Sequence, residues 1–373
     1  MNKKKILTII LIILFIGFVA ERINTNKSDV YEEQNKISIK KNKNMLSMNL
    51  EQTAGAGDYK TVTQSSWPTE GYEFNTELSR CEKGSELSWD DTKKAVIMQG
   101  NVSDKCYVYF DLIPSMTLAE YVISQYTGVQ GENGIYYHNS SLENGAGDNS
   151  YRYAGASNNV NNYICLGSDA TTCPDANLFR IIGVFGDQTK VIRAKSVGDQ
   201  KWNTSKANAW SSSSLNTYLN GEYLTNLGTL ADKIATTTWK VGGGSSTYLY
   251  DVPKTAYQYE VGSSASTTTY DAKIGLMYVS DYGFAADQSG WTTKLSSYNS
   301  NKSKNWLNTG RYIEWTLSRN SDNTSNAFGV NSTGYVDNYN VTKSYVVRPS
   351  FNLESSVKYV SGSGSMSDPV RVN

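Results

Sequence analysis

Four cysteines are the residues of this 373-residue chain whose chemistry is easiest to narrow down. They could be metal ligands, a catalytic thiol, free buried thiols or disulfides. No C-x-x-C pair occurs, and the only histidine, His138, lies far from every cysteine in sequence, which argues against zinc and against a His-activated thiol. Of the three possible disulfide pairings, order along the chain favours Cys81 with Cys106 and Cys165 with Cys173. Free buried thiols are the alternative.

Other catalytic arrangements are weaker. A glycosidase needs only two carboxylates, for which Asp271, Asp281 and Glu314 are candidates, but 35 acidic residues always supply some. His138 stands in a Gly- and Asn-rich stretch without the G-x-S-x-G elbow of a serine hydrolase, so we expect it on a surface loop. The GGGSS stretch from Gly242 lacks the Lys-Ser/Thr ending of a phosphate-binding loop. We predict no enzyme, with a glycosidase-type cell-envelope hydrolase as an alternative.

The first residues predict the compartment. Three lysines precede an uncharged apolar run over residues 6–20, which by the positive-inside rule sends the rest of the chain outward. The run is shorter than the roughly 20 residues of a spanning helix, which would suit a cleaved signal peptide. Cleavage after Ala20, however, would need a small residue at the position of Phe18. We therefore expect a single-pass signal anchor in the cell membrane over residues 1–22, with secretion after cleavage as the alternative. The polar residues 23–60 predict a flexible tether.

A small module is predicted for residues 61–112. Trp89 lies between Cys81 and Cys106, and the closing CYVYF run predicts a strand, so we expect a small disulfide-linked β-sandwich. The segment resembles a short module of multi-module surface proteins of low-GC Gram-positive bacteria, in which a C…W-D…K-C-x-V-Y-F-D pattern recurs without an established activity.

A larger α+β domain is predicted for residues 113–373. A helix is expected over residues 115–126, with Ser115 or Thr117 as its cap, and another over residues 213–227. The dipeptide Gly186-Asp187 between two β-rich runs predicts a hairpin. The predicted strands are residues 177–185, 189–197, 273–280, 312–319, 327–330 and 344–353.

This order of motifs resembles a large, uncharacterised family of Gram-positive extracellular domains. The shared motifs are the strand pair at residues 182–192, the S-x-L-N-x-Y-L-N helix at 214–220, the W-x-x-S-R strand at 315–319 and the V-R-P strand at 347–349, which together cover about residues 175–355. The resemblance implies a C-type-lectin-like fold, in which late strands and their loops form the binding face. By that analogy the binding candidates are Trp306, Trp315, Arg319, Tyr335 and Tyr339, although for Trp315 we favour core packing and for Arg319 a structural ion pair.

The predicted fold class is therefore α+β, with a β-rich, lectin-like C-terminal domain of few helices, a small N-terminal β-sandwich and one membrane helix. The predicted function is recognition or adhesion through an extracellular glycan or protein, and a passive structural surface component is a further alternative. Equal numbers of basic and acidic residues, 35 each, argue against nucleic acid. No cofactor is predicted; calcium held by Asp322 and neighbouring amides is the alternative, although the spacing there is not that of an EF-hand.

Overall fold

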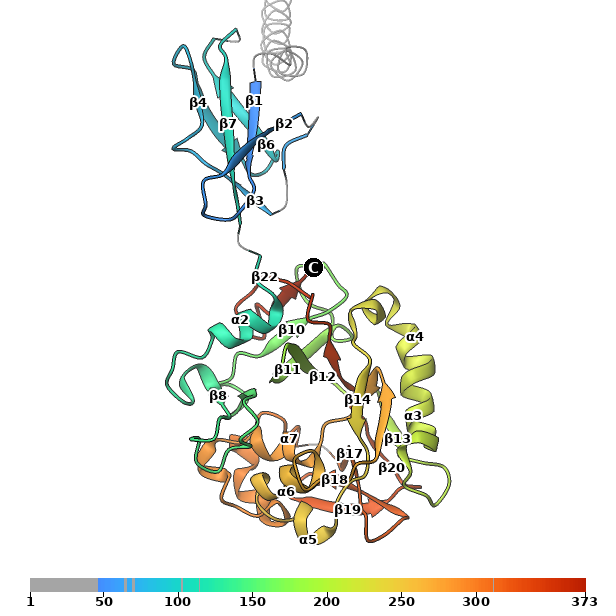
Figure 1. Cartoon of the computed structure of the whole chain (residues 1–373). Helices are drawn as coiled ribbons and strands as arrows, with labels where there is room; N and C mark the ends of the chain where they lie inside the picture. The colour runs from blue at the N-terminus through green and yellow to red at the C-terminus, as the bar shows by residue number, and fades with distance from the viewer. Residues whose placement is uncertain (1–45, 64–65, 69–70, 102, 114, 311) are drawn as a thin grey trace, which may run out of the picture. The chain divides into compact units, whose positions relative to one another are not determined.

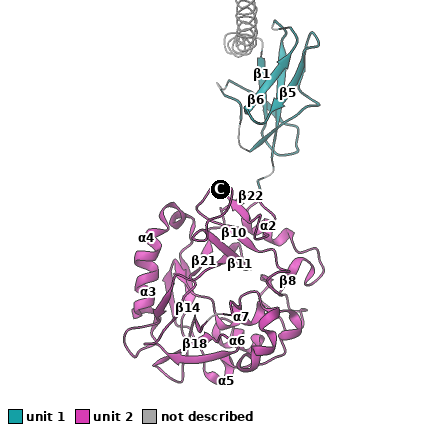
Figure 2. Cartoon of the chain, turned by 180° about the vertical axis from the view of Figure 1, so that it is seen from behind, with its two compact units in different colours: residues 1–115 teal, residues 116–373 magenta. Residues whose placement is uncertain are grey.

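The computed structural model describes residues 46–63, 66–68, 71–101, 103–113, 115–310 and 312–373 (Figure 1). The chain divides into two compact units, one ending at Ser115 and one running from Met116 to Asn373 (Figure 2). The sequence places this boundary between residues 112 and 113.

The first unit is a sheet covered by a hairpin. In the sheet β7 (Cys106–Leu112) runs parallel to β1 (Leu46–Glu51) and antiparallel to β3 (Tyr72–Phe74) and β4 (Arg80–Cys81), while β2 (Tyr59–Val62) pairs with β1. The hairpin consists of β5 (Glu86–Asp90) and β6 (Ala95–Gln99). Alternate residues of β7 turn inward, so that Phe110 is buried with Val108, and the Trp89 ring packs 5.6 Å from the Phe110 ring. The tether predicted for residues 23–60 is therefore wrong in its second part, because β1 and part of β2 belong to this sheet.

A large sheet forms the centre of the second unit. Its strand order is β16-β21-β12-β11-β10-β23-β22, and β9 pairs with β11 and β8. The predicted hairpin is confirmed, because β11 and β12 are antiparallel and join at Gly186-Asp187. All residues of β11 except its last are buried, as expected for a central strand. The strands are β8 (Ile135–Tyr137), β9 (Tyr151–Tyr153), β10 (Tyr163–Cys165), β11 (Leu178–Phe185), β12 (Gln188–Arg193), β16 (Ile274–Gly275), β21 (Ser350–Leu353), β22 (Tyr359–Ser361) and β23 (Val370–Val372).

A second sheet in this unit has the order β13-β20-β17-β18-β19, which makes β19 an edge strand. Its strands are β13 (Asp199–Lys201), β17 (Glu314–Arg319), β18 (Asn326–Val330), β19 (Val336–Asn340) and β20 (Ser344–Val346), and β14 (Thr237–Lys240) pairs with β15 (Thr269–Ala272) separately. The single strand predicted for residues 344–353 is two strands, β20 and β21, in different sheets. The chain changes sheet at Arg348-Pro349, where proline cannot donate a ladder hydrogen bond.

The α-helices of the described residues are short. They are α2 (Leu118–Ser124), α3 (Ser214–Tyr218), α4 (Leu224–Asn226), α5 (Ser246–Leu249), α6 (Pro253–Glu260) and α7 (Val279–Phe284), and a π-helical turn (Leu219–Tyr223) joins α3 to α4. Thr117 caps α2 in a capping box with Glu120, as the sequence predicts for that threonine. The strand predicted for residues 273–280 is correct only for β16. Its last residues belong to the start of α7, where Asp281 accepts a hydrogen bond from the amide of the capping residue Tyr278.

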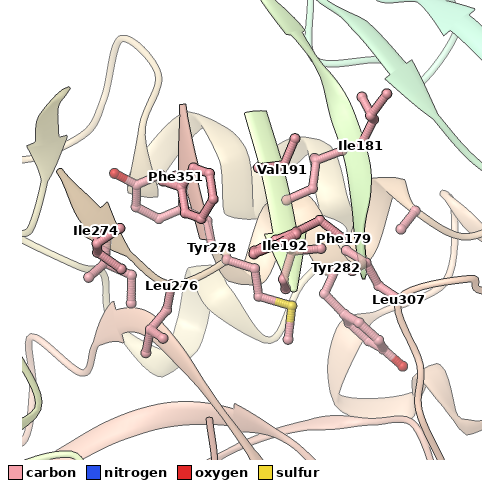
Figure 3. Packing of buried hydrophobic residues seen from close by; sticks show 14 of the residues in the cluster. Phe179, Ile181, Val191, Ile192, Ile274, Leu276, Tyr278, Tyr282, Leu307 and Phe351 are labelled. Carbon is pink, nitrogen blue, oxygen red and sulfur yellow. The ribbon is translucent and has the colours of Figure 1, made fainter. Parts of the chain in front are cut away.

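One apolar core joins the sheets and helices of the second unit. Phe179 and Ile181 of β11, Val191 of β12 and Phe351 of β21 are all fully buried within it (Figure 3). Gly183 is required where β9 pairs with β11, since a Cβ there would lie 2.1 Å from the Tyr151 carbonyl oxygen.

The predicted fold class, α+β with one membrane helix, is wrong as stated. The described residues form a β-rich protein with few, short helices, and none of those helices is both long and apolar enough to span a bilayer. The predicted anchor at residues 1–22 lies outside the residues that the structure describes.

Candidate functional site

Three half-buried tyrosines gather on the second sheet of the C-terminal unit. We call Tyr335, Tyr339, Tyr345 and the neighbouring Asn331 the tyrosine surface. Tyr339 on β19 and Tyr345 on β20 have ring centroids 5.3 Å apart, and both rings pack on Trp315 of β17, at 6.4 and 5.0 Å. The fully buried indole of Trp315 therefore packs beneath the rings of Tyr339 and Tyr345.

Asn331 links two of these rings through one amide. Its Nδ2 donates to the hydroxyl oxygens of Tyr335, at 3.4 Å, and Tyr339, at 3.3 Å. Burial raises the pKa of Tyr339 to about 12, so its hydroxyl stays protonated at neutral pH and can itself donate. The Tyr339 ring lies over Gly329, where an added Cβ would stand 3.3 Å from its Cδ2 atom. The surface thus combines apolar ring area with hydroxyl and amide groups.

The edge strand that carries Tyr339 is held from its other side. Tyr250, which follows α5, donates from its hydroxyl to Asp337 Oδ1 at 2.6 Å, and the same hydroxyl accepts from Asn338 Nδ2 at 2.5 Å. The Tyr250 ring also packs edge-on against Phe328 of β18, with centroids 5.6 Å apart. These contacts fix β19 in place, so that Tyr339 presents its ring from a rigid support.

Of the binding residues predicted from sequence, Tyr335 and Tyr339 lie together and the other three play different parts. Trp306 is buried, donates from Nε1 to the Tyr153 carbonyl oxygen at 2.7 Å and carries the Arg180 guanidinium over its ring, so it cannot meet a ligand. Trp315 is buried as well. Arg319 is half-buried and its Nε donates to the Gly242 carbonyl oxygen at 2.8 Å, rather than to a carboxylate.

Tyr345 was missed by the sequence reasoning. Its only sequence signal is its position two residues before the V-R-P motif, within the predicted strand at residues 344–353. Tyr345 on β20 and Tyr339 on β19 have β17 and β18 between them in the strand order, and their rings meet above Trp315 of β17 and Gly329 of β18.

The predicted carboxylates take three different sets of partners. Glu314 is buried and accepts from Arg348 Nε at 2.7 Å, while Asp271 is exposed and accepts from the Thr238 hydroxyl at 2.7 Å. Asp281 belongs to a buried ionic cluster with Lys190. Within the described ranges no group of three or more His, Cys, Asp or Glu side chains is arranged to hold a metal ion.

The loop considered for calcium is held by an amide. Asn208 is buried, and its Nδ2 donates to the backbone carbonyl oxygens of Asn320, Asn323 and Asn326 at 2.8, 3.0 and 2.7 Å. These carbonyls are the ligands that such a turn would offer to a cation, and here a side-chain donor already engages them. Asp322 is exposed at the tip of the turn.

Both predicted disulfides are confirmed. Cys81–Cys106 joins β4 to β7 at directly paired positions, and Cys165–Cys173 closes a short loop at the end of β10. Neither pair leaves a thiol for catalysis or metal binding.

A buried ionic cluster is the feature that the sequence did not predict. It contains the buried residues Arg152, Lys190 and Asp281 and the half-buried Asp148. Arg152 contacts Asp148 Oδ2 at 2.6 Å and Asp281 Oδ1 at 3.6 Å, and Lys190 Nζ contacts Asp281 Oδ2 at 2.5 Å.

His138 lies beside this cluster and is fully buried, so its expected place on a surface loop is wrong. Its Nδ1 accepts from the Ala146 amide, and its ring packs edge-on against Phe284. Burial, and then the charge of Arg152, hold the pKa of His138 well below its usual range.

Comparison with known protein families gives a match to part of the chain. Residues 186–355 match the family model of a domain of unknown function, DUF6273. The match begins at the turn between β11 and β12 and ends just after β21, so it includes the tyrosine surface, Lys190 and Asp281. No curated protein and no solved structure matches the chain. The expectation of an uncharacterised domain family over about residues 175–355 is confirmed to that extent.

Proposed function

We propose that this protein is exported and that its C-terminal unit recognises an extracellular ligand through the tyrosine surface. The observation that carries the proposal is the group of half-buried rings on β19 and β20, resting on Trp315 beside the amide of Asn331. Both disulfides support export, because such bonds persist mainly outside the reducing cytosol.

A glycan is the ligand class that we favour. Aromatic faces pack against the C–H side of a sugar ring, and amide and hydroxyl groups give directional hydrogen bonds to its hydroxyls. The rings of Tyr339 and Tyr345 offer the first kind of contact, and Asn331 with the tyrosine hydroxyls offers the second. The chain has a formal net charge of zero, which suits a neutral ligand better than a strongly charged one.

Binding to a glycan panel and to purified peptidoglycan tests the proposal. We expect saturable binding by the unaltered protein and a weakening of about 5–10-fold in Tyr339→Ala and in Tyr345→Ala, equivalent to ~1–1.4 kcal/mol for the loss of one aromatic contact. Tyr218→Ala is the matched control, because Tyr218 is also a half-buried tyrosine of this unit but lies on α3. Thermal unfolding of each variant verifies that the fold is kept.

Equal weakening in the Tyr218 control, or binding that survives removal of both Tyr339 and Tyr345, would exclude the tyrosine surface as the site. Saturable binding to a protein in place of every glycan would transfer the proposal to protein recognition. Failure to bind either class would favour a passive structural component, and turnover of a chromogenic glycoside would favour a hydrolase.

A further inference from the structure

Lys190 and Asp281 form the closest contact of the buried ionic cluster. The Lys190 Nζ lies 2.5 Å from Asp281 Oδ2, and their side chains are only 6% and 3% exposed. Lys190 lies on β12 and Asp281 in the first turn of α7, 91 positions later in the sequence. An amine nitrogen in such contact with a carboxylate oxygen lies about 3–3.5 Å from the carboxyl carbon, which is the separation of a near-attack arrangement.

The surroundings of this pair are aromatic. Lys190 Nζ lies 4.5 Å from the ring centre of Tyr278, 5.4 Å from that of Trp239 and 5.7 Å from that of Phe185. Rings in these positions keep water away from the ammonium group. Separating two such charges from water costs several kcal/mol per ion in a protein interior, and a neutral product would avoid that cost.

The other atoms around Asp281 distinguish its two oxygens. Arg152 Nη1 lies 3.6 Å from Oδ1, while Oδ2 accepts from Lys190 and from the Tyr278 amide at 2.8 Å. A guanidinium at Oδ1 stabilises the negative charge that collects on an oxygen when a nucleophile adds to the carboxyl carbon.

We propose that Lys190 and Asp281 condense into an intramolecular amide bond that ties β12 to α7. A proton passes from the ammonium group to Oδ2, and the freed nitrogen lone pair attacks Cγ of Asp281. The Cγ–Oδ2 bond then breaks, and Oδ2 leaves as water with two of the three hydrogens of the original ammonium group. The third hydrogen stays on the new amide nitrogen, and Oδ1 becomes the amide carbonyl oxygen beside Arg152. No oxidant, reductant or added reagent is required.

Two properties of the cluster favour this reaction over a lasting ion pair. Burial lowers the pKa of Lys190, against the opposing effect of Asp281, which makes the neutral amine easier to reach. Glu260 interacts electrostatically with both partners, and burial raises its pKa to about 7, so below that pH it is mostly neutral and does little to hold Lys190 in the ammonium form. The bond is independent of what the tyrosine surface binds.

Intact mass spectrometry of the full chain, reduced and alkylated, tests the proposal directly. We expect a mass lower by one water molecule than that calculated for the same chain with four alkylated cysteines. After trypsin we expect a branched peptide that joins the Lys190 and Asp281 segments, with no cleavage after Lys190. Asp281→Asn should lose ammonia in place of water, because the amide nitrogen then becomes the leaving group. Asp281→Ala should keep its full mass.

The chain also contains an internal control. Lys195 and Asp175 form an equally close ion pair in the same unit, but their side chains are 56% and 65% exposed, so we expect no bond between them. A natural chain that shows the full calculated mass, without the loss of water, would overturn the proposal. A branched peptide that joins any other pair of residues would overturn it too. If Asp281→Ala fails to fold, the peptide map of the natural chain and the mass of Asp281→Asn still decide the question.

Discussion

Removal of the Cys81–Cys106 disulfide should destabilise the first unit alone. The pair is separated by 25 positions, and for a loop of that length the chain-entropy relation gives ~3.5 kcal/mol of stabilisation. The Cys165–Cys173 pair closes a loop of only eight positions, for which the same relation gives ~2.5 kcal/mol. The double variant Cys81→Ala, Cys106→Ala should therefore lose about 1 kcal/mol more than Cys165→Ala, Cys173→Ala.

The first unit has little else to compensate for this loss. Its apolar core is a single small cluster around Val108 and Phe110, whereas the second unit has a core that spans two sheets. Small domains have total stabilities of about 5–15 kcal/mol, so ~3.5 kcal/mol is a large share for the first unit.

Hydrogen exchange measured by mass spectrometry at increasing urea reports each unit separately. We expect peptides from β1 and β7 to lose protection at clearly lower urea in the Cys81/Cys106 variant, with peptides from β11 and β12 unchanged. The Cys165/Cys173 variant should show the reverse pattern and a smaller shift. Unchanged protection of β7, or a larger effect from the shorter loop, would refute the loop-entropy reasoning.

Two further predictions concern buried charges. Burial raises the pKa of Glu260 from 4.5 to about 7, so between these pH values the folded protein holds a proton that the unfolded chain has released. The folded state is therefore more stable at low pH, by about 3 kcal/mol. This contribution is complete below about pH 4.5 and is lost as the pH rises to about 7. Glu260→Gln should remove that part of the pH dependence, as urea midpoints at about pH 5 and about pH 8 will measure, and an unaltered slope would contradict it. Arg348→Met should cost about 3–5 kcal/mol, because it leaves Glu314 buried without its cation. Adding Glu314→Gln should recover part of the loss in chemical denaturation, and no recovery would contradict the pairing.

The sequence by itself determined the features whose partners are close along the chain. The disulfides, the turn at Gly186-Asp187 and the Thr117 cap all depend on residues a few to a few tens of positions apart. Their local geometry is encoded by residue type, because thiols pair, glycine takes a left-handed conformation and a threonine hydroxyl meets a helix amide.

Only the tertiary structure decided which polar and aromatic residues are buried and which of them meet. Lys190 and Asp281 are 91 positions apart, and nothing in the surrounding pattern marks either as an interior residue. Trp306 is a binding candidate in the sequence, but the fold buries it. Trp315, for which the sequence already favours core packing, is buried too, and Tyr339 and Tyr345 pack on its ring. The physical reason is that a buried charge or ring is stabilised by long-range partners, and hydrophobic periodicity describes only the preference of a residue for one face of its own element.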